Sequence, residues 1–434
     1  MNLIARIAAP AAALALAGLA ATACAPATSS GASQEDGRTG TLRVWLFREV
    51  GNAPKEKVVD AAVAGFLKAH EGVDVRVEYI PVETRAERIK AAFNDPKSAP
   101  DVIEYGNTDT AGYVEDGGLA DVTAEFGAWD EAADTDPTAR QSVTVGGRVH
   151  GVPLFVGARA LYYRTDVFAD LGIGPPGTQD ELVSIAKRIR AARPELYGIA
   201  VGGANTYGAL PFIWAHGGGI AELRDGAWTS VIDSPASRRG IAAYTSLFGE
   251  DNCPAATCAG MGGNATITAF AAGKAAMVIG GDFSRRAVEA GEAGGRYAVV
   301  PLPGVREGEI APAFAGGNNL GVLRSTGHRT LAVDLMKRLA GKETQAALFE
   351  AMGFLPTFTD VRAAAVAEEP FVAPFIETLG AGSRFVPATP AWGRIDASRV
   401  LPTMFQEVVS GRRDVRTAAS DAARAMDAAF AAAG

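Results

Sequence analysis

Apolar residues recur along this chain with two spacings, one typical of strands and one typical of helices. Between residues 41 and 105 they predict strands at 41–47, 73–79 and 101–105, separated by helices at 55–70 and 83–93. Alternating strands and helices of this kind form an open sheet whose faces are covered by helices. The first part of the chain is therefore predicted to be an α/β unit.

The pattern changes at 143–149, where two short strand-like pieces flank Gly146-Gly147 and lead into Gly151-Val152-Pro153. This is typical of a hairpin, and we expect the chain to leave its first lobe at this point. A second α/β series follows, with strands at 161–164, 198–201, 275–279 and 297–301 and helices at 180–193 and 235–248.

Two of these helices carry start signals. Thr178 and Glu181 have the spacing of a capping box, and Ser234-Pro235 supplies an N-cap followed by proline at the first helical position. A strand at 319–323, helices at 331–339 and 343–351 and an all-helical end from 370 to 433 complete the pattern. The last helix is amphipathic, and we expect its apolar side to pack on the second lobe.

The N-terminus has the layout of an export signal. A lone Arg6 precedes an Ala/Leu-rich run that ends at Ala21-Thr22-Ala23-Cys24. This order predicts a lipoprotein signal peptide at residues 1–23, with Cys24 as the lipidated first residue of the mature protein. A plain signal peptide cut near Ala23 and an uncleaved anchor are the alternatives. Residues 24–40 are small and polar, which predicts a flexible tether.

Composition narrows the choice of partners. The 434 residues are 48% hydrophobic and 21% charged, which suits a folded protein, and the net charge of −8 comes with no basic stripe for nucleic acid. Cys253 and Cys258 lie close together in an exported chain and predict a disulfide. The four histidines are scattered singly, so we expect no metal site.

Several segments carry a family resemblance, and they occur in family order from about residue 41 to residue 410. The clearest are Ala99–Asp109, Tyr162–Asp166, Gly316–Leu320, Gln345–Thr357 and Pro387–Trp392. Together they resemble the extracellular sugar-binding proteins of ABC importers, the maltose-binding-protein superfamily. Within it, they look most like the actinobacterial lipoproteins that take up di- and oligosaccharides, chitobiose-type binders among them.

The resemblance implies a two-lobed periplasmic-binding-protein-like α/β fold (class II) with a hinge and an interlobe ligand cleft. We expect residues 41–152 plus 312–355 in the N-terminal lobe and residues 153–311 plus 356–434 in the C-terminal lobe, with return crossings near 301–312 and 355–358. It also implies a monomer without cofactor or catalytic step, which delivers a di- or oligosaccharide to the transmembrane permease subunits of an ABC importer. Such a protein would be held by its lipid anchor on the outer face of the cell membrane.

A sugar site needs aromatic rings for the C–H faces and polar groups for the hydroxyls. Trp392, in a Pro-rich segment, matches the family's stacking tryptophan, so we expect Trp392→Ala to weaken binding by about tenfold or more and leave the fold intact. Trp214 is a second candidate, for which a core position is the alternative. Arg48 and Glu49 follow the first strand at its carboxyl end, where open α/β sheets present ligand sites.

The loop after the strand at 101–105 offers a ring, amides and a carboxylate in Tyr105, Asn107 and Asp109. Asn107 could instead cap the next helix. The maltose-binding branch has a basic residue at the place of Asp109, which leaves the sugar open. The other candidates lie next to glycines or before the last crossing, where turn chemistry or a hinge role is the alternative, and they are Arg159, Tyr207, Asp282, Asn318, Asn319 and Phe354.

Two other functions remain open from the sequence. An exported glycoside hydrolase or lyase would need two carboxylates facing each other across about 5 to 10 Å, and Asp109 with Asp282 could supply them from different lobes. The same receptor fold could also bind a phosphorylated polyol or a peptide. Few arginines are available for a phosphate, which are Arg48, Arg159 and Arg394.

Overall fold

The computed structural model describes residues 36–49, 51–81 and 84–433. The predicted signal peptide, Cys24 and the tether up to residue 35 lie outside this range. Among the helices in the described range, none has the length and apolar content needed to cross a bilayer. Residues 36–434 form one compact unit.

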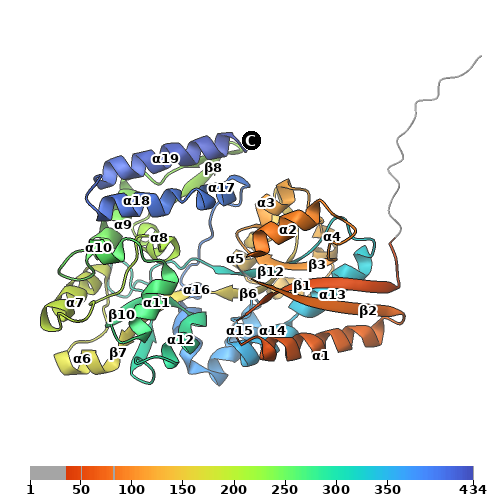
Figure 1. Cartoon of the computed structure of the whole chain (residues 1–434), viewed down its shortest axis with the longest axis horizontal. Helices are drawn as coiled ribbons and strands as arrows, with labels where there is room; N and C mark the ends of the chain where they lie inside the picture. The colour runs from red at the N-terminus through yellow and green to blue at the C-terminus, as the bar shows by residue number, and fades with distance from the viewer. Residues whose placement is uncertain (1–35, 50, 82–83, 434) are drawn as a thin grey trace, which may run out of the picture. The chain divides into compact units, whose positions relative to one another are not determined.

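The first lobe is built on a five-stranded sheet with the order β2-β1-β3-β12-β6 (Figure 1). Its strands are β1 (Gly40–Arg48), β2 (Val73–Pro81), β3 (Val102–Gly106), β12 (Gly316–Val322) and β6 (Val152–Gly157). β1 is parallel to β2 and β3, whereas β12 runs antiparallel to both β3 and β6. The strand–helix alternation predicted for residues 41–105 is confirmed.

Both faces of this sheet are covered, because successive side chains of a strand point to opposite sides. On one face Leu42, Val44 and Leu46 of β1 pack under α1 (Ala53–Ala69), α13 (Arg329–Ala340) and α14 (Lys342–Met352). On the other face Phe47 packs with residues of α2 (Arg85–Phe93) and α3 (Thr110–Glu115). The sheet is therefore a buried layer whose strand ends carry the accessible groups.

Between β3 and β6 the chain forms short elements at one end of this lobe. They are α4 (Thr123–Gly127), η2 (Asp130–Asp134), α5 (Pro137–Ser142) and the hairpin of β4 (Thr144–Val145) and β5 (Arg148–Val149). Gly146 and Gly147 take φ values of 56° and 77° in the turn, as the Gly-Gly pair predicts.

The first crossing lies later than predicted. The strand that follows Gly151, β6, pairs with β12, so the chain leaves the first sheet at Ala158 rather than at Pro153. The reason is that β6 continues the first sheet at the far side of β12, a long-range pairing with no local sequence signal. A further isolated bridge joins Val156 of β6 to Leu355, at the crossing expected near 355–358.

The second lobe is built on an antiparallel sheet of β7 (Arg159–Arg164), β10 (Met277–Gly281) and β11 (Tyr297–Val300), in the order β10-β7-β11. Leu161, Met277 and Ile279 face the larger core of this lobe, whereas Ala160 and Tyr162 face a second cluster. The strand predicted at 198–201 is reduced to isolated bridges from Tyr197 and Ala200 to the residues before and within β10.

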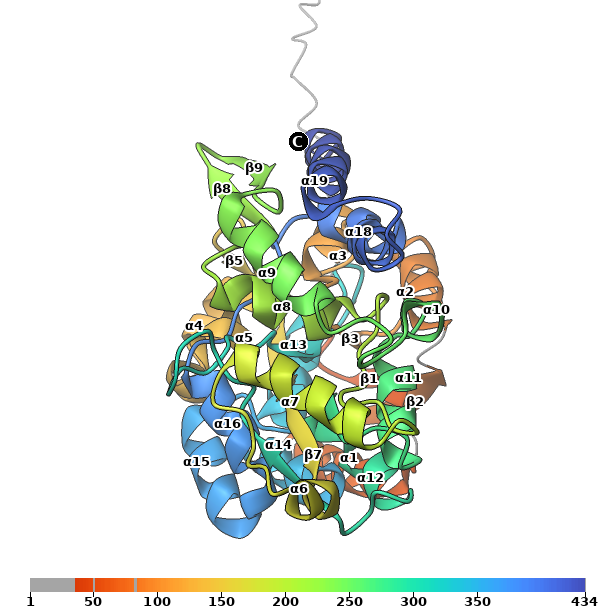
Figure 2. The same cartoon turned by 90° about the vertical axis from the view of Figure 1, so that its left-hand side faces the viewer.

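Helices surround this sheet (Figure 2). The helices predicted at 180–193 and 235–248 are α7 (Gln179–Ala192) and α9 (Pro235–Thr245), capped by the side chains of Thr178 and Ser234 as predicted. The others between β7 and β11 are α6 (Thr165–Leu171), α8 (Thr206–Ala215), α10 (Ala255–Cys258), α11 (Gly263–Ala271), η3 (Asp282–Ser284) and α12 (Arg285–Glu289). A surface hairpin of β8 (Ala221–Arg224) and β9 (Ala227–Ser230) packs beside the last helix.

The C-terminal part consists of helices that belong mostly to the second lobe. They are α15 (Thr359–Glu368), η4 (Pro370–Val372), α16 (Ala373–Gly380), α17 (Ala391–Ala397), α18 (Val400–Val409) and α19 (Val415–Ala431). As predicted, α19 buries one alanine-rich side, including Ala419, Ala422 and Met426, in the core of this lobe.

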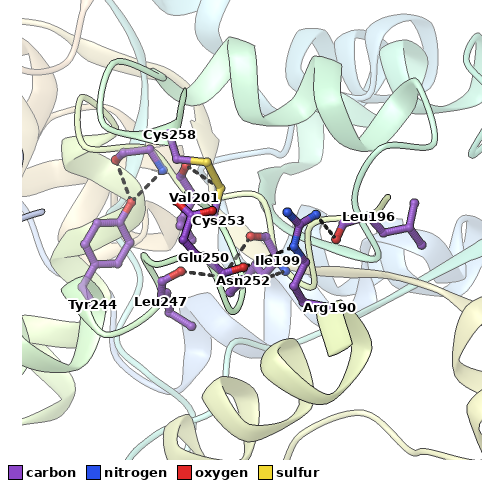
Figure 3. The surroundings of a disulfide bond; sticks show 11 residues. Arg190, Leu196, Ile199, Val201, Tyr244, Leu247, Glu250, Asn252, Cys253 and Cys258 are labelled. Atoms are coloured by element: carbon purple, nitrogen blue, oxygen red, sulfur yellow. Dashed lines mark hydrogen bonds between the residues drawn. A yellow bond between two sulfur atoms is a disulfide. The ribbon is translucent and has the colours of Figure 1, made fainter. Parts of the chain in front are cut away.

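Two local features complete the fold. Cys253 and Cys258 form the expected disulfide (Figure 3), next to the bond from Gly203 N to the Cys258 carbonyl. The end of the predicted tether is fixed, because the Gly37 amide donates to the Gly327 carbonyl at 2.8 Å and Asp36 accepts from Thr330. The expectation of a flexible tether is therefore wrong for Asp36 and Gly37, and its earlier part lies outside the described residues.

Candidate functional site

The carboxyl ends of β1, β3 and β6 meet at one edge of the first sheet, together with the start of β12. Gly316 pairs with Gly157, and Asn318 pairs with Gly106. Glu49, Asp109 and Asn318 therefore project from neighbouring positions at this edge, where open α/β sheets carry ligand sites. The second lobe begins at the same place, because β7 follows β6 after a single residue.

A buried ion pair lies directly beneath this edge. Lys55 Nζ lies 2.9 Å from Glu104 Oε2, and Lys55 also donates to the Phe47 carbonyl at 2.9 Å. The other carboxylate oxygen of Glu104 accepts from Asn318 Nδ2 at 2.7 Å. Lys55 is also 3.7 Å from Glu49 Oε1, so one pair fixes two groups at the edge.

Sequence reasoning missed Lys55 and Glu104. The signal was present, because Lys55 lies on the apolar face of a predicted helix, and Glu104 lies within an apolar strand. A charge at a buried position needs a partner. Lys55 also favours the ionised form of Glu49. Burial raises the pKa of the Glu49 carboxyl, and the positive charge of Lys55 acts to lower it.

Asp109 stands at the N-terminus of α3 without capping that helix through its side chain. Burial raises the pKa of Asp109 to about 6, Arg85 acts to lower it, and Asp396 of α17 raises it further. Asp396 has its own pKa raised by burial. Among the described residues neither carboxylate has a hydrogen-bond donor or ion-pair partner from a side chain.

α17 meets α3 across the boundary between the lobes (Figure 1). Arg394 of α17 forms an ion pair of 3.4 Å with Glu115 at the end of α3. The two helices thus bring Asp109 and Asp396 into electrostatic range of each other. Asp396 was not among the residues predicted from the sequence.

Tyr207 is an aromatic residue of the second lobe at this boundary. It lies at the start of α8, and its ring stacks on Phe314 with centroids 4.4 Å apart. Burial raises its pKa, as do the negative charges of Asp396 and Asp109, whereas Arg159 acts in the opposite direction. Tyr207 therefore lies near charged groups of both lobes, and its role in a ligand site stays a prediction.

Trp392 is close to this group but is not positioned as a stacking platform. It is 2% exposed and belongs to the core of the second lobe. Its indole Nε1–H has no acceptor with full hydrogen-bond geometry, and the nearest polar partner is the Tyr207 hydroxyl. The expectation that its face stacks on a sugar is therefore corrected: the packed core covers the ring, and an unused donor at its edge remains.

Phe283 is the exposed ring that sequence reasoning missed. Its exposure is 56%, and it follows Asp282 directly after the carboxyl end of β10. A Cβ added at Gly157 would lie 3.7 Å from the Phe283 ring, so the ring stands against the crossing between the lobes. The signal that could have identified it is an aromatic residue after Gly-Gly-Asp at a strand end.

Three other predicted residues are buried inside the protein, whereas a ligand role for Arg48 stays a prediction. Tyr105 is fully buried, Trp214 is in the core of the second lobe, and Asn319 is buried between Ser142 and Thr110. Arg48 is exposed on β1, where its guanidinium contacts the Tyr79 carbonyl. These corrections share one cause, because proximity to a strand end does not determine which way a side chain points.

Three more predicted residues serve the boundary itself. Asn107 donates to the Ala315 carbonyl at 2.9 Å, and Phe354 stacks on Phe155 at 4.3 Å. Asp282 accepts from the Ala158 amide at 2.9 Å, and burial raises the pKa of this carboxyl to about 7. Asp282 thus links the end of β10 to Ala158, where the chain crosses between the lobes. Because its carboxylate is engaged there, it is not a second unpaired carboxylate that could act together with Asp109.

The described part of the chain holds no cluster of three or more His, Cys, Asp or Glu side chains suited to a metal ion. What the boundary does hold is a mixed set of acceptors, donors and one exposed ring. Carboxylates and amide oxygens accept hydroxyl hydrogen bonds, while guanidinium, phenol and indole groups donate. This arrangement can bind a polyhydroxylated molecule without covalent chemistry.

Comparison with known proteins identifies the group to which this arrangement belongs. Residues 61–374 match the family described as bacterial extracellular solute-binding protein. The diacetylchitobiose binding protein DasA of Streptomyces coelicolor is 25% identical over 352 residues, covering 78% of this chain and 80% of that protein. A galactooligosaccharide-binding protein of Bacillus subtilis is 24% identical over 93% of both chains.

Solved structures share the fold. The GacH receptor of Streptomyces glaucescens, determined unliganded and with acarbose, superposes with a TM-score of 0.75. Its sequence identity is 23%, and the match covers 91% of this chain and 99% of that one. The two-lobed architecture expected from the sequence is thereby confirmed.

Proposed function

This chain belongs to the bacterial extracellular solute-binding protein family, and on that premise we propose that it captures a di- or oligosaccharide between its lobes and delivers it to the permease of an ABC importer. The relatives named for sugars support this choice of ligand. Family members bind solutes, and the protein is proposed to act as a receptor without a catalytic step.

One observation supports a sugar most strongly. Asp109 of the first lobe and Asp396 of the second lie within electrostatic range of each other and of Tyr207, and neither carboxylate has a hydrogen bond or ion pair with a side chain among the described residues. Asp396 is exposed, whereas Asp109 is half-buried, and leaving the Asp109 carboxyl unpaired costs about 1 to 3 kcal/mol, which ligand hydroxyls would recover. Phe283 adds the exposed ring that a sugar face needs.

The proposed closure is a hinge motion of the two lobes around the ligand. A ligand favours the closed form only as far as it binds that form better than the open one. Groups contributed by both lobes have this property, because an open form cannot present Asp109 and Asp396 to the same molecule. Glu49, Asn318 and Arg159 complete the proposed contact set.

Calorimetric titration of the chain from Ala25 onward would test this function. The panel contains N,N′-diacetylchitobiose, a galactooligosaccharide, maltotriose and acarbose, with mannitol 1-phosphate and a tripeptide as non-sugar ligands. Saturable binding of an oligosaccharide that is recovered intact supports the receptor. Binding of the phosphate or the peptide alone would instead favour the same fold with another ligand.

The glycosidase alternative has a specific motive in Asp109 and Asp396, because general acid catalysis requires a carboxyl with a raised pKa, and the charge of Asp396 contributes to the raised pKa of Asp109. Incubating the protein with each oligosaccharide and analysing the products by chromatography separates the two functions. Cleavage that disappears in Asp109→Asn would overturn the receptor assignment.

We also propose that the mature protein is a monomer anchored to the outer face of the cell membrane through lipidated Cys24. The support is the sequence around Ala21–Cys24. Cells fed a clickable fatty acid should label the wild-type protein and leave Cys24→Ser unlabelled. Equal labelling of both would reject the anchor, and light scattering of the Ala25–Gly434 protein tests the monomer.

A further inference from the structure

Arg159 begins β7, directly after the crossing from the first lobe. Its guanidinium carbon lies 5.7 Å from the centroid of the Tyr207 ring and 5.8 Å from that of Phe283. Both distances are within the range of cation–π attraction. The side chain is partly exposed, so the guanidinium lies among protein groups while part of it remains accessible.

The guanidinium makes no hydrogen bond or ion pair with any residue in the part of the chain that the structure describes. Aromatic rings attract the charge but leave the five N–H donors unused. Burial lowers the pKa of Arg159, while Tyr207 and Asp282 act in the opposite direction. Arg159 is therefore a partly desolvated cation with free donors.

The two arginines that are buried in the described part of the chain are different. Arg164 donates to both carboxylate oxygens of Asp166, and Arg362 pairs with Asp136. Their exposures are 7% and 5%, as expected for charges whose partners belong to the protein. Asp282 acts on Arg159 through its charge alone, because no hydrogen bond or ion pair joins the two side chains in the described part of the chain, and Asp282 Oδ1 accepts from the Ala158 amide.

One of the two rings beside Arg159, that of Tyr207, is supported by further rings. Tyr207 stacks on Phe314 at an interplanar angle of 25°, and Phe314 lies 6.1 Å from Phe385 with the rings 15° from parallel. Phe314 and Phe385 are a buried and a half-buried ring of the second lobe's core cluster. This aromatic row limits how far the guanidinium can move, which is what a donor needs in order to discriminate between ligands.

We propose that Arg159 is a specificity-determining residue, whose guanidinium donates in a fork to two adjacent oxygens of the sugar unit that contacts Phe283. This inference rests on the proposed function and specifies the ligand chemistry. A planar guanidinium matches paired oxygens better than a lysine ammonium does. Two sources offer such a pair, namely neighbouring hydroxyls of a neutral sugar and the carboxylate of an acidic one.

The test uses Arg159→Met and Arg159→Lys in the Ala25–Gly434 protein. Arg190→Met is the matched control, because Arg190 lies 5.9 Å from the Tyr197 ring but donates to the Pro194 and Leu196 carbonyls. Titrations use N,N′-diacetylchitobiose, a galactooligosaccharide, maltotriose and digalacturonic acid. Melting curves of all variants report folding separately.

For the oligosaccharide that the wild type binds, Arg159→Met should weaken binding by about tenfold or more, as expected for lost charged hydrogen bonds. With a neutral sugar, Arg159→Lys should lose nearly as much as Arg159→Met. With digalacturonic acid, Arg159→Lys should retain most of the affinity, because the charge alone attracts the carboxylate. Arg190→Met should bind like the wild type.

Monodeoxy analogues of the bound sugar distinguish direct contact from a structural effect. The wild type should lose about tenfold on removal of the contacted hydroxyl, whereas Arg159→Met should be nearly indifferent to that removal. Equal sensitivity of both proteins, or wild-type affinity in Arg159→Met, overturns the inference and leaves the receptor function standing. A wild type that binds none of the four sugars rejects the receptor function, and this inference falls with it.

Discussion

Lys55 and Glu104 form an ion pair of 2.9 Å whose side chains are 1% and 0% exposed. The pair lies beneath the edge of the first sheet where β1, β3 and β6 end. It contacts two further side chains there, because Glu104 accepts a hydrogen bond from the Asn318 amide and Lys55 lies near Glu49. Buried ion pairs contribute little net stability, but removal of one partner leaves an uncompensated charge.

Replacing Lys55 by Met should therefore lower the free energy of unfolding by about 3 to 5 kcal/mol. The double variant Lys55→Met/Glu104→Gln should recover part of this loss, because the buried carboxylate is gone. Urea unfolding measures both. Arg148→Met, which removes the exposed Arg148–Asp121 pair, serves as the control and should change stability by about 0.5 kcal/mol or less. Equal effects of the single and double variants would contradict the argument.

Phe283→Ala should weaken sugar binding by about tenfold while the melting temperature stays close to that of the wild type. The ring is more than half exposed, so its removal leaves little cavity, yet a stacked sugar face would lose its platform. Leu223→Ala, at a residue of β8 that is 59% exposed, is the matched control. Unchanged affinity in Phe283→Ala would exclude the ring from the site.

Trp392→Ala is expected to act on folding first. Removing a core tryptophan costs about 3 to 5 kcal/mol through the cavity it leaves, and Trp392 is 2% exposed. This replaces the sequence-based expectation of weaker binding with an intact fold. A variant that melts like the wild type would show that the ring is not part of the core.

The raised pKa of Asp109 predicts a pH effect with a defined sign. Burial places it at about 6, above the ordinary 3.8 of an aspartate. Between pH 3.8 and about 6 the folded state therefore keeps a proton on Asp109 that the unfolded state has lost. The stability contributed by this group is fully present below pH 3.8 and is lost as the pH rises through about 6. Asp109→Asn should remove this part of the slope in melting temperature between pH 4 and pH 7.

Asp116→Asn, at the other end of α3, is the control variant. It should keep the wild-type dependence of melting temperature on pH between pH 4 and pH 7. Ligand binding should follow the opposite direction, because the ionised Asp109 accepts stronger, charge-assisted hydrogen bonds from sugar hydroxyls than the protonated form does. Affinity for the oligosaccharide should accordingly rise from pH 5 to pH 7, and less so in Asp109→Asn. A pH-independent affinity in the wild type would remove Asp109 from the contact set.

The disulfide should contribute about 2 kcal/mol by the loop-entropy estimate for so short a closed segment. The disulfide lies beside the backbone of Gly203, whose amide donates to the Cys258 carbonyl, and Gly203 comes a few residues before Tyr207 in the chain. The Cys253→Ser/Cys258→Ser protein should melt at a lower temperature and, when measured below its transition, bind sugar with nearly wild-type affinity. A large loss of affinity at low temperature would instead mean that the disulfide shapes the site.

The sequence predicted the elements well where a local pattern decides them. The β1–α1–β2–α2–β3 order, the Gly146-Gly147 hairpin and the caps at Thr178 and Ser234 all depend on neighbouring residues. The crossing at Ala158 depends on β6 pairing with β12, which no local pattern encodes. Long-range pairing therefore accounts for the difference between the expected and observed lobe boundary.

The site was predicted less well, for a related reason. Residue type and a position near a strand or helix end make Tyr105, Trp214 and Trp392 candidates, but all three rings are buried in the hydrophobic core. Phe283 was not predicted as a site residue, although it is the exposed aromatic ring at the boundary between the lobes. Side-chain direction at a strand end depends on packing from the other lobe, and that information is spread over the whole chain.

The place of β12 in the first sheet affects how the protein can be secreted. The Asn318–Glu104 contact joins residues 214 positions apart, and β12 fills the gap between β3 and β6. A chain that is translocated N-terminus first delivers β1 to β3 outside the membrane long before β12 arrives. The edge of β3 must wait unpaired meanwhile, exposed to proteases and to other unfinished chains. The yield of exported receptor should therefore depend on how quickly the second half of the chain follows the first.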